Sequence, residues 1–237
     1  MADTNYKIQW GEVGHHMYET GVEQGVLYVQ DSNGAYPTGV AWDGLSGVTE
    51  KPTGADTTKL YADDTVYLNL IAAETFEATI EAYMYPDEFA VCDGSVEVAP
   101  GAKIGQQNRR AFGMSYKTIV GNDVDGNDKG YKLHLIYGLT ASPSERAYKT
   151  INDSPEAISF SWDTKSTPVN VPGYKKTSII TLDSTKVDAT KLAQIEQILY
   201  GTAATTGENP TPAVDARLPL PEEILGILAG NANNNAG

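Results

Sequence analysis

The residues of this chain that could do chemistry are a few carboxylates, three histidines and one cysteine. Glu77 and Glu81 lie four apart in an alternating segment, so they would share one face of a strand, as glycosidase carboxylates can. A hydrolase acid needs an apolar pocket to raise its pKa, whereas the other residues on this face are threonines and tyrosines. We therefore expect a solvated acidic wall rather than a catalytic pair.

A second acidic group resembles a calcium-binding loop; it consists of Asp123, Asp125 and Asp128. An EF-hand loop requires glycine at position six and glutamate at position twelve. Counted from Asp123, those positions hold Asp128 and His134, so the pattern fails. The run is rich in Asp, Asn and Gly, which is typical of a hairpin tip.

The histidines give no metal site. His15 and His16 are adjacent, so their side chains diverge in an extended segment, and only Glu12 and Glu19 lie near them in sequence. His134 alternates with Lys132 in a strand-like segment, and we expect it on the wet face.

Cys92 lies among acidic residues, which would raise its thiol pKa and make it inert. A single cysteine allows no internal disulfide, which fits folding in a reducing cytoplasm. No nucleophile elbow, phosphate loop or dinucleotide motif is present. The sequence thus predicts no catalytic, cofactor-binding or metal-binding residue, and no enzyme.

Composition favours one large β domain or two small ones. The 237 residues are 41% hydrophobic and include 23 glycines and 14 tyrosines but four phenylalanines. The net charge of −14 argues against gripping nucleic acid or an anionic membrane. No apolar run reaches the length of a membrane helix, and the first residues lack an apolar signal segment.

Periodicity predicts the elements that would position these residues. Strands are expected at 26–29, 66–71, 75–85, 112–119, 132–137, 158–162 and 178–182. A capping box at 142–145 predicts a short helix, Asp188 caps a helix over 189–200 that stops at Gly201, and Pro221 opens a last short helix. Residues 44–64, with three glycines and a proline, are expected to be a long exposed loop.

We therefore predict a mainly β protein, a sandwich or flattened barrel of antiparallel sheets, with one to three short helices. Residues 1–25 would be an N-terminal arm and 26–200 the β domain. Residues 201–230 would be a C-terminal extension with a short helix, and 231–237 a disordered tail.

A series of short motifs runs in order along the chain. It comprises GVAWDGL at 39–45, EKPTGA at 50–55, LYAD at 60–63, YLNL at 67–70, ATIEAYMYPDEFAVCDGS at 78–95, APGAKIGQQ at 99–107, GYKLHLIYG at 130–138 and YKTINDSPEAISFSW at 148–162. This series, over roughly residues 10 to 225, resembles the major tail proteins of long-tailed bacteriophages. These form the tail tube and are similar in fold to the tube subunit of type VI secretion systems.

The resemblance implies a structural protein of a virion tail, made in the host bacterial cytoplasm. Six copies would form a ring whose inner sheets join into one barrel, and stacked rings would form a conduit for DNA ejection. The implied partners are further copies of the chain and other tail proteins: the tape measure, the terminator and the distal tail protein. DNA would be a cargo that does not stick, with no cofactor and no membrane involved. The alternative that the chain forms a tail terminator or adaptor ring, which shares this fold, stays open.

Residues 42–94 hold eleven acidic side chains against two lysines, a net −9. An acidic lumen would repel phosphates, so we hypothesise that Glu77 and Glu81 line it. Contacts between subunits or rings are expected from the loop 44–64, the termini and the only compact basic spot in the middle of the chain; the residues are Trp42, Leu45, Tyr61, Asp63, Asp64, Arg109 and Arg110. The alternative is a carbohydrate- or receptor-binding β-sandwich of a virion, which would gather its exposed aromatic side chains in one pocket.

Overall fold

The computed structural model describes the chain except for residues 1–7, 9, 152, 154–155, 206–210 and 231–237, so the predicted disordered tail lies outside the described residues. The strands are β1 (Tyr18–Val29), β2 (Gly39–Ala41), β3 (Leu45–Thr53), β4 (Thr57–Ala62), β5 (Thr65–Ile71), β6 (Thr75–Ala82), β7 (Val96–Ala99), β8 (Ala102–Ile104), β9 (Phe112–Asn122), β10 (Gly126–Ala141), β11 (Phe160–Ser166) and β12 (Ile179–Asp183). The described helices are the 3₁₀ turn Asp87–Val91 and two α-helices, α1 (Ala189–Tyr200) and α2 (Pro221–Ala229).

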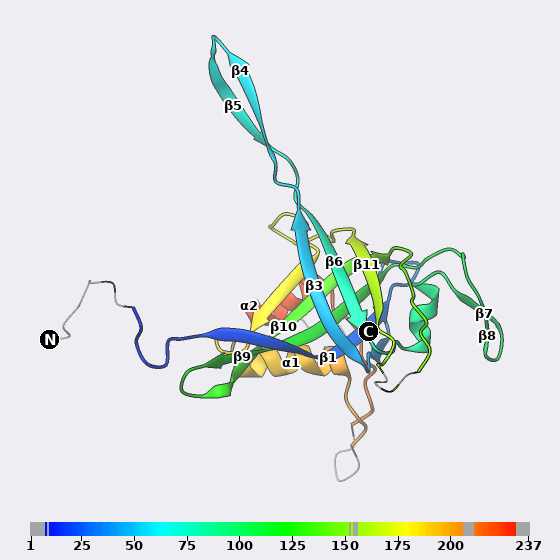
Figure 1. The fold of residues 1–237 in the computed structure, drawn as a ribbon. Helices are drawn as coiled ribbons and strands as arrows, with labels where there is room; N and C mark the ends of the chain where they lie inside the picture. The colour runs from blue at the N-terminus through cyan, green and yellow to red at the C-terminus, as the bar shows by residue number, and fades with distance from the viewer. Residues whose placement is uncertain (1–7, 9, 152, 154–155, 206–210, 231–237) are drawn as a thin grey trace.

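One antiparallel sheet of eight strands folds over on itself. Its order is β2-β1-β9-β10-β11-β6-β3, and β12 also pairs with β10. The long β10 makes this possible, because its middle part (132–136) pairs with β12 and its last part (139–141) with β11. In Figure 1, β3, β6 and β11 form a layer that crosses over β1, β9 and β10. The predicted fold class, mainly antiparallel β with short helices, is confirmed.

A core lies between the two layers. Leu27, Met114 and Ile136 from one layer and Ile80 and Trp162 from the other are all fully buried. Aromatic rings pack edge to face here, for example Phe89 against Trp162 with ring centroids 5.0 Å apart. This core fixes which face of β6 points inward.

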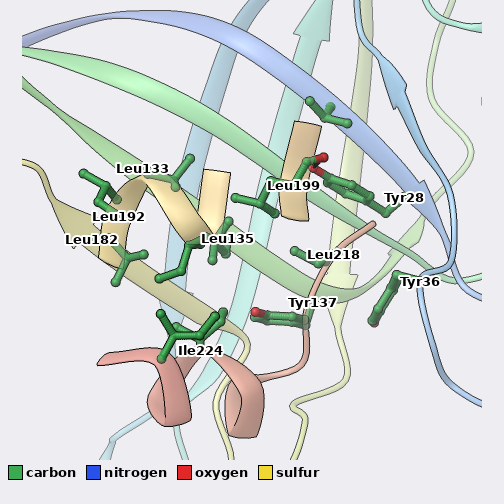
Figure 2. Close-up of a cluster of buried hydrophobic side chains, with 13 residues drawn as sticks. Tyr28, Tyr36, Leu133, Leu135, Tyr137, Leu182, Leu192, Leu199, Leu218 and Ile224 are labelled. Carbon is green, nitrogen blue, oxygen red and sulfur yellow. Dashed lines mark hydrogen bonds between the residues drawn. The ribbon is translucent and has the colours of Figure 1, made fainter. Parts of the chain in front are cut away.

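A second core lies on the other face of the sheet, where residues of β1, β10 and β12 pack under the two helices (Figure 2). Leu192, Ile195 and Leu199 recur at helical spacing along α1 and are buried. The Tyr137 hydroxyl donates a hydrogen bond of 2.9 Å to the Pro219 carbonyl, just before α2. The segment that follows α1, including α2, therefore packs against the same sheet.

Four sequence-based expectations on local structure are wrong. The capping box at 142–145 opens no helix among the described residues, and Arg146 of this segment binds Asp93. The N-terminal arm is shorter, since β1 already begins at Tyr18 and pairs with β9 through two bulges. The loop 44–64 consists mostly of strands. His134 is buried, at 9% exposed, rather than wet.

None of the described helices is long and apolar enough to span a membrane.

Candidate functional site

The β6 strand presents two distinct faces. Ala78, Ile80 and Ala82 are buried in the core between the layers, as the alternation predicts. Glu77 and Glu81 lie on the opposite, outer face, together with Thr79. The outer face of β3, β6 and β11 is therefore the surface on which the predicted lumen carboxylates sit.

Ion pairs run across this outer face. Lys51 of β3 and Lys165 of β11 lie directly opposite Glu77 on its two sides, and the Lys165 Nζ is 3.6 Å from the Glu77 Oε1. In the next row, the Thr79 hydroxyl donates a 2.5 Å hydrogen bond to the Asp163 carboxylate, which also lies 3.5 Å from the Lys51 Nζ. The face therefore alternates in charge rather than forming the uniformly acidic wall that the sequence suggested.

The contacts of Asp163 favour its ionised form. The Thr79 hydrogen bond, with the nearby Lys51, holds the pKa of Asp163 below its usual value despite partial desolvation. A small hollow of about 280 Å³ opens here, lined by Lys51, Glu77, Asp163 and Lys165 among others. A general acid would need a raised pKa, so the geometry at Asp163 works against that role.

An arm projects from this layer. Strands β4 and β5 form a hairpin that continues the β3–β6 ribbon away from the body (Figure 1). Asp63 and Asp64 form its tip with φ of 50° and 59°, the positive values that a two-residue hairpin turn of type I′ requires. Glycine is needed at Gly54, where β3 passes into β4, because its φ is 92° and a Cβ would lie 2.4 Å from a backbone oxygen.

The arm is apolar but uncovered. Leu60 lies opposite Leu68 in the register, and both side chains, with Leu70, lie on one face of the hairpin. Leu60 and Leu68 are 41% and 46% exposed, and Tyr61 and Tyr67 are more exposed still. A two-stranded hairpin has no core of its own. Exposed apolar surfaces are typical of sites that bind another molecule.

The other predicted contact residues divide into two groups. Tyr61, Asp63 and Asp64 lie on the exposed arm, where their contact with a neighbouring subunit stays a prediction. Trp42 and Leu45 instead pack against the core between the layers, and the Trp42 Nε1 donates to the Met84 carbonyl at 3.0 Å.

The two arginines have partners within the chain. The Arg109 Nη1 donates to the Ala141 carbonyl at 2.9 Å and lies 3.8 Å from Asp93. The Arg110 Nη2 donates to the Gln30 carbonyl at 2.7 Å. These bonds hold the segment before β9 against the body. Contact of the two arginines with an acidic patch of a neighbouring subunit stays a prediction, and it would have to form in addition to these bonds.

The remaining reactive groups hold the fold together. Asp123 accepts hydrogen bonds from the Gly14 backbone and from His16, and its pKa falls to about 2, chiefly through the His16 bond. It lies in the β9–β10 turn, as the hairpin-tip interpretation predicted. Burial, with the charge of Asp93, raises the pKa of Cys92 to about 12, although Arg110 lowers it. Cys92 is a free and buried cysteine.

Comparison with known proteins gives weak structural similarities. No protein-family model and no curated protein matches the chain. A chain of the PVC sheath–tube complex, an extracellular contractile injection system in the extended state, is similar with a TM-score of 0.35 and 8% identity, covering 68% of this chain and 88% of that one. A chain of the anti-feeding prophage (AFP) baseplate gives a TM-score of 0.32 and 9% identity, covering 76% and 99%. Similarities this weak assign no function, which must be argued from the chain's own surfaces.

Proposed function

We propose that this chain is a structural subunit of a bacteriophage-type tail tube, which self-associates into hexameric rings that stack into a hollow conduit for DNA. The observation that carries the proposal is the arm. The body buries two well-packed cores, yet the β4–β5 hairpin exposes a row of leucines that nothing in the described chain covers. A subunit that must reach a neighbouring copy has use for such an arm.

Two further features support self-association. The eight-stranded sheet ends at β2 and at β3, so both edges carry backbone groups that a neighbouring copy would continue into a larger barrel. The outer face of β3, β6 and β11 carries three carboxylates against two lysines. In the proposed tube this face, with Glu77 and Glu81, lines the lumen and keeps a modest negative excess that repels phosphates.

The partners and location follow from the same proposal. They are further copies of the chain, the tape measure, terminator and distal tail proteins, and a virion tail made in the bacterial cytoplasm. We assign the chain no catalytic role, and turnover in a broad hydrolase screen would overturn that.

The alternative, a carbohydrate- or receptor-binding module, finds less support. Its exposed aromatic side chains should converge on one pocket. Among the described residues they are spread instead over separate segments: Trp10 near the N-terminus, Tyr18 in β1, Tyr61 and Tyr67 on the arm, Tyr83 after β6, Tyr148 before β11 and Tyr174 before β12. Specific binding on a glycan array, without assembly, would favour the alternative.

The test is to remove the arm and follow assembly by negative-stain electron microscopy. The Ala72 N–H already donates to the Asp56 carbonyl at 2.9 Å, so an Asn-Gly turn can replace residues 57–71 and close the ribbon there. We expect the full chain to form rings and tubes as its concentration rises. We expect the armless chain to keep the melting temperature of the body and to form no tubes, whereas tubes of normal length from it would refute the role of the arm.

A further inference from the structure

The end of the core nearest the arm is closed by polar side chains. Here Glu19 of β1, Thr118 and Tyr116 of β9, His134 of β10 and Glu50 of β3 come together from both layers. The His134 ring stacks on the Tyr116 ring with centroids 4.7 Å apart and planes 3° from parallel. The histidine is therefore held in one orientation, with its two nitrogens facing opposite ways.

The hydrogen bonds assign a proton to one of these nitrogens. The Thr118 hydroxyl donates its single proton to the Glu19 Oε1 at 2.5 Å. Towards the His134 Nε2, 2.9 Å away, the hydroxyl can then act only as an acceptor. The Nε2 must carry a hydrogen, so the neutral ring would bear a lone pair on Nδ1.

That lone pair would face an anion. The His134 Nδ1 is buried and lies 3.3 Å from the Glu50 Oε1, and among the described residues it makes no hydrogen bond. Glu50 already accepts a 2.5 Å bond from the Tyr116 hydroxyl. Protonation of Nδ1 would turn this contact into a charge-assisted hydrogen bond. It would complete a continuous chain of bonds from Glu19 through Thr118 and His134 to Glu50.

The charges of the cluster do not balance while the ring is neutral. Glu19 also binds Lys132, the neighbouring residue on the same face of β10. Two carboxylates against one lysine leave one negative charge, which a protonated His134 neutralises. The nearby Lys117 points to the other face of β9, where it pairs with Glu196 at 2.6 Å, and takes no part.

Glu50 connects this cluster to the arm. It lies in β3, a few residues before the arm begins, and its side chain reaches across to the opposite layer. Beyond Glu50, Lys51 bonds to β11 and Thr53 to β6, both in their own layer. The Glu50 bonds therefore hold the base of the arm against the body.

We propose that His134 and Glu50 form a pH-sensitive latch, which fixes the base of the arm while the imidazole is protonated and loosens it when the proton leaves. All residues of the latch lie within one subunit, so this proposal can be tested independently of tube assembly. Histidine changes its charge between about pH 5 and 8, and loss of its proton removes the Nδ1 donor, so rising pH weakens the latch.

Low pH also weakens the latch, because it protonates the carboxylates. The contact with His134, with the Tyr116 hydroxyl, holds the pKa of Glu50 below its usual value although burial opposes this. Burial also raises the pKa of Glu19, but bonds from Lys132 and Thr118 bring it below its usual value. A carboxylate whose pKa is lower in the folded than in the unfolded chain stabilises the fold at pH values above its unfolded pKa. This stabilisation is lost as the pH falls through its folded pKa. The latch thus requires both a protonated His134 and ionised carboxylates, so it weakens as the pH moves away from this state in either direction.

Hydrogen exchange of the full chain, at a concentration too low for assembly, tests the latch. After correction for intrinsic exchange rates, protection of the β3 amides should fall about tenfold from pH 5.5 to pH 8.0, the effect of one charge-assisted hydrogen bond. In His134→Gln this pH dependence should vanish. The matched control is His15→Gln, since His15 is exposed and pairs only with Glu12 among the described residues; it should behave like the unmodified chain.

A second variant keeps the test decisive if His134→Gln does not fold. Glu50→Gln retains the imidazole and the Tyr116 contact but removes the anion, and it too should abolish the pH dependence. Equal protection of β3 at both pH values in the unmodified chain would overturn the proposal. So would an undiminished pH dependence in Glu50→Gln.

Discussion

The leucine face of the arm can be tested without removing the arm. Replacing Leu60 and Leu68 by threonine exchanges one cross-strand pair for another with high strand propensity, so the hairpin should persist. Fully burying a leucine side chain contributes about 1.5–3 kcal/mol. Because these two are 41% and 46% exposed, covering the remainder contributes roughly 1 kcal/mol each.

The pair therefore contributes about 2 kcal/mol to each arm contact, or about a 30-fold change in its association constant. Sedimentation velocity over a concentration series, with electron microscopy in parallel, measures the concentration at which assembly begins. We expect Leu60→Thr/Leu68→Thr to raise that concentration about 30-fold or more. The melting temperature of the free chain should stay unchanged, because the arm contributes nothing to either core.

The matched control lies one residue along. Lys59 faces Asn69 in the adjacent cross-strand pair, so their side chains point to the opposite face of the arm. Lys59→Thr/Asn69→Thr should assemble within about threefold of the unmodified chain, since exposed polar side chains contribute little. Equal shifts in the two double variants, or no shift in either, would refute a docking role for the leucine face.

Two further predictions concern charge. Glu81→Lys, at an exposed position flanked by Gly47 and Ser161 rather than by lysines, should leave tube assembly intact but slow DNA delivery several-fold relative to Glu81→Gln; normal delivery would remove Glu81 from the lumen. Asp123→Asn should release the segment around His16, seen as faster proteolysis there at pH 7. In the unmodified chain the same release should come only as the pH falls towards 2, because a lowered carboxylate pKa stabilises above the unfolded value.

Elements encoded by local pattern were predictable from the sequence. The helix over 189–200 has the predicted bounds, and the Asp188 side chain accepts from the backbone of Thr190 and Lys191 as a cap should. The inward and outward faces of β6 also follow the alternation. In both cases the signal lies within a dozen residues, so no knowledge of distant partners is needed.

The arm was missed because its signals are ambiguous. Pro52 and the nearby glycines suggested an irregular loop, but β3 is an edge strand, where the missing N–H of a proline costs no ladder bond. Gly54 permits the passage into β4 rather than ending the ribbon. Asp63 and Asp64 could have revealed the hairpin, since aspartate tolerates the positive φ of its turn better than most residues.

The position of His134 could not be read from alternation, because both faces of β10 are covered. One face of the strand packs against the helices and the other against β3, and only the three-dimensional fold reveals the second layer. Period-two patterning separates two faces but does not say that one of them is wet.

Acidic residues in the sequence likewise overstate the acidity of any one surface. Of the eleven carboxylates between residues 42 and 94, Asp93 is held by Arg146 beneath the surface, Glu50 belongs to the latch, and Glu77 is paired with Lys165. Their partners come from segments that the fold, not the sequence order, brings close. Repulsion of DNA in the proposed lumen therefore depends on the carboxylates that have no lysine as a cross-strand neighbour. On β6 this carboxylate is Glu81, whose neighbours in the register are Gly47 and Ser161.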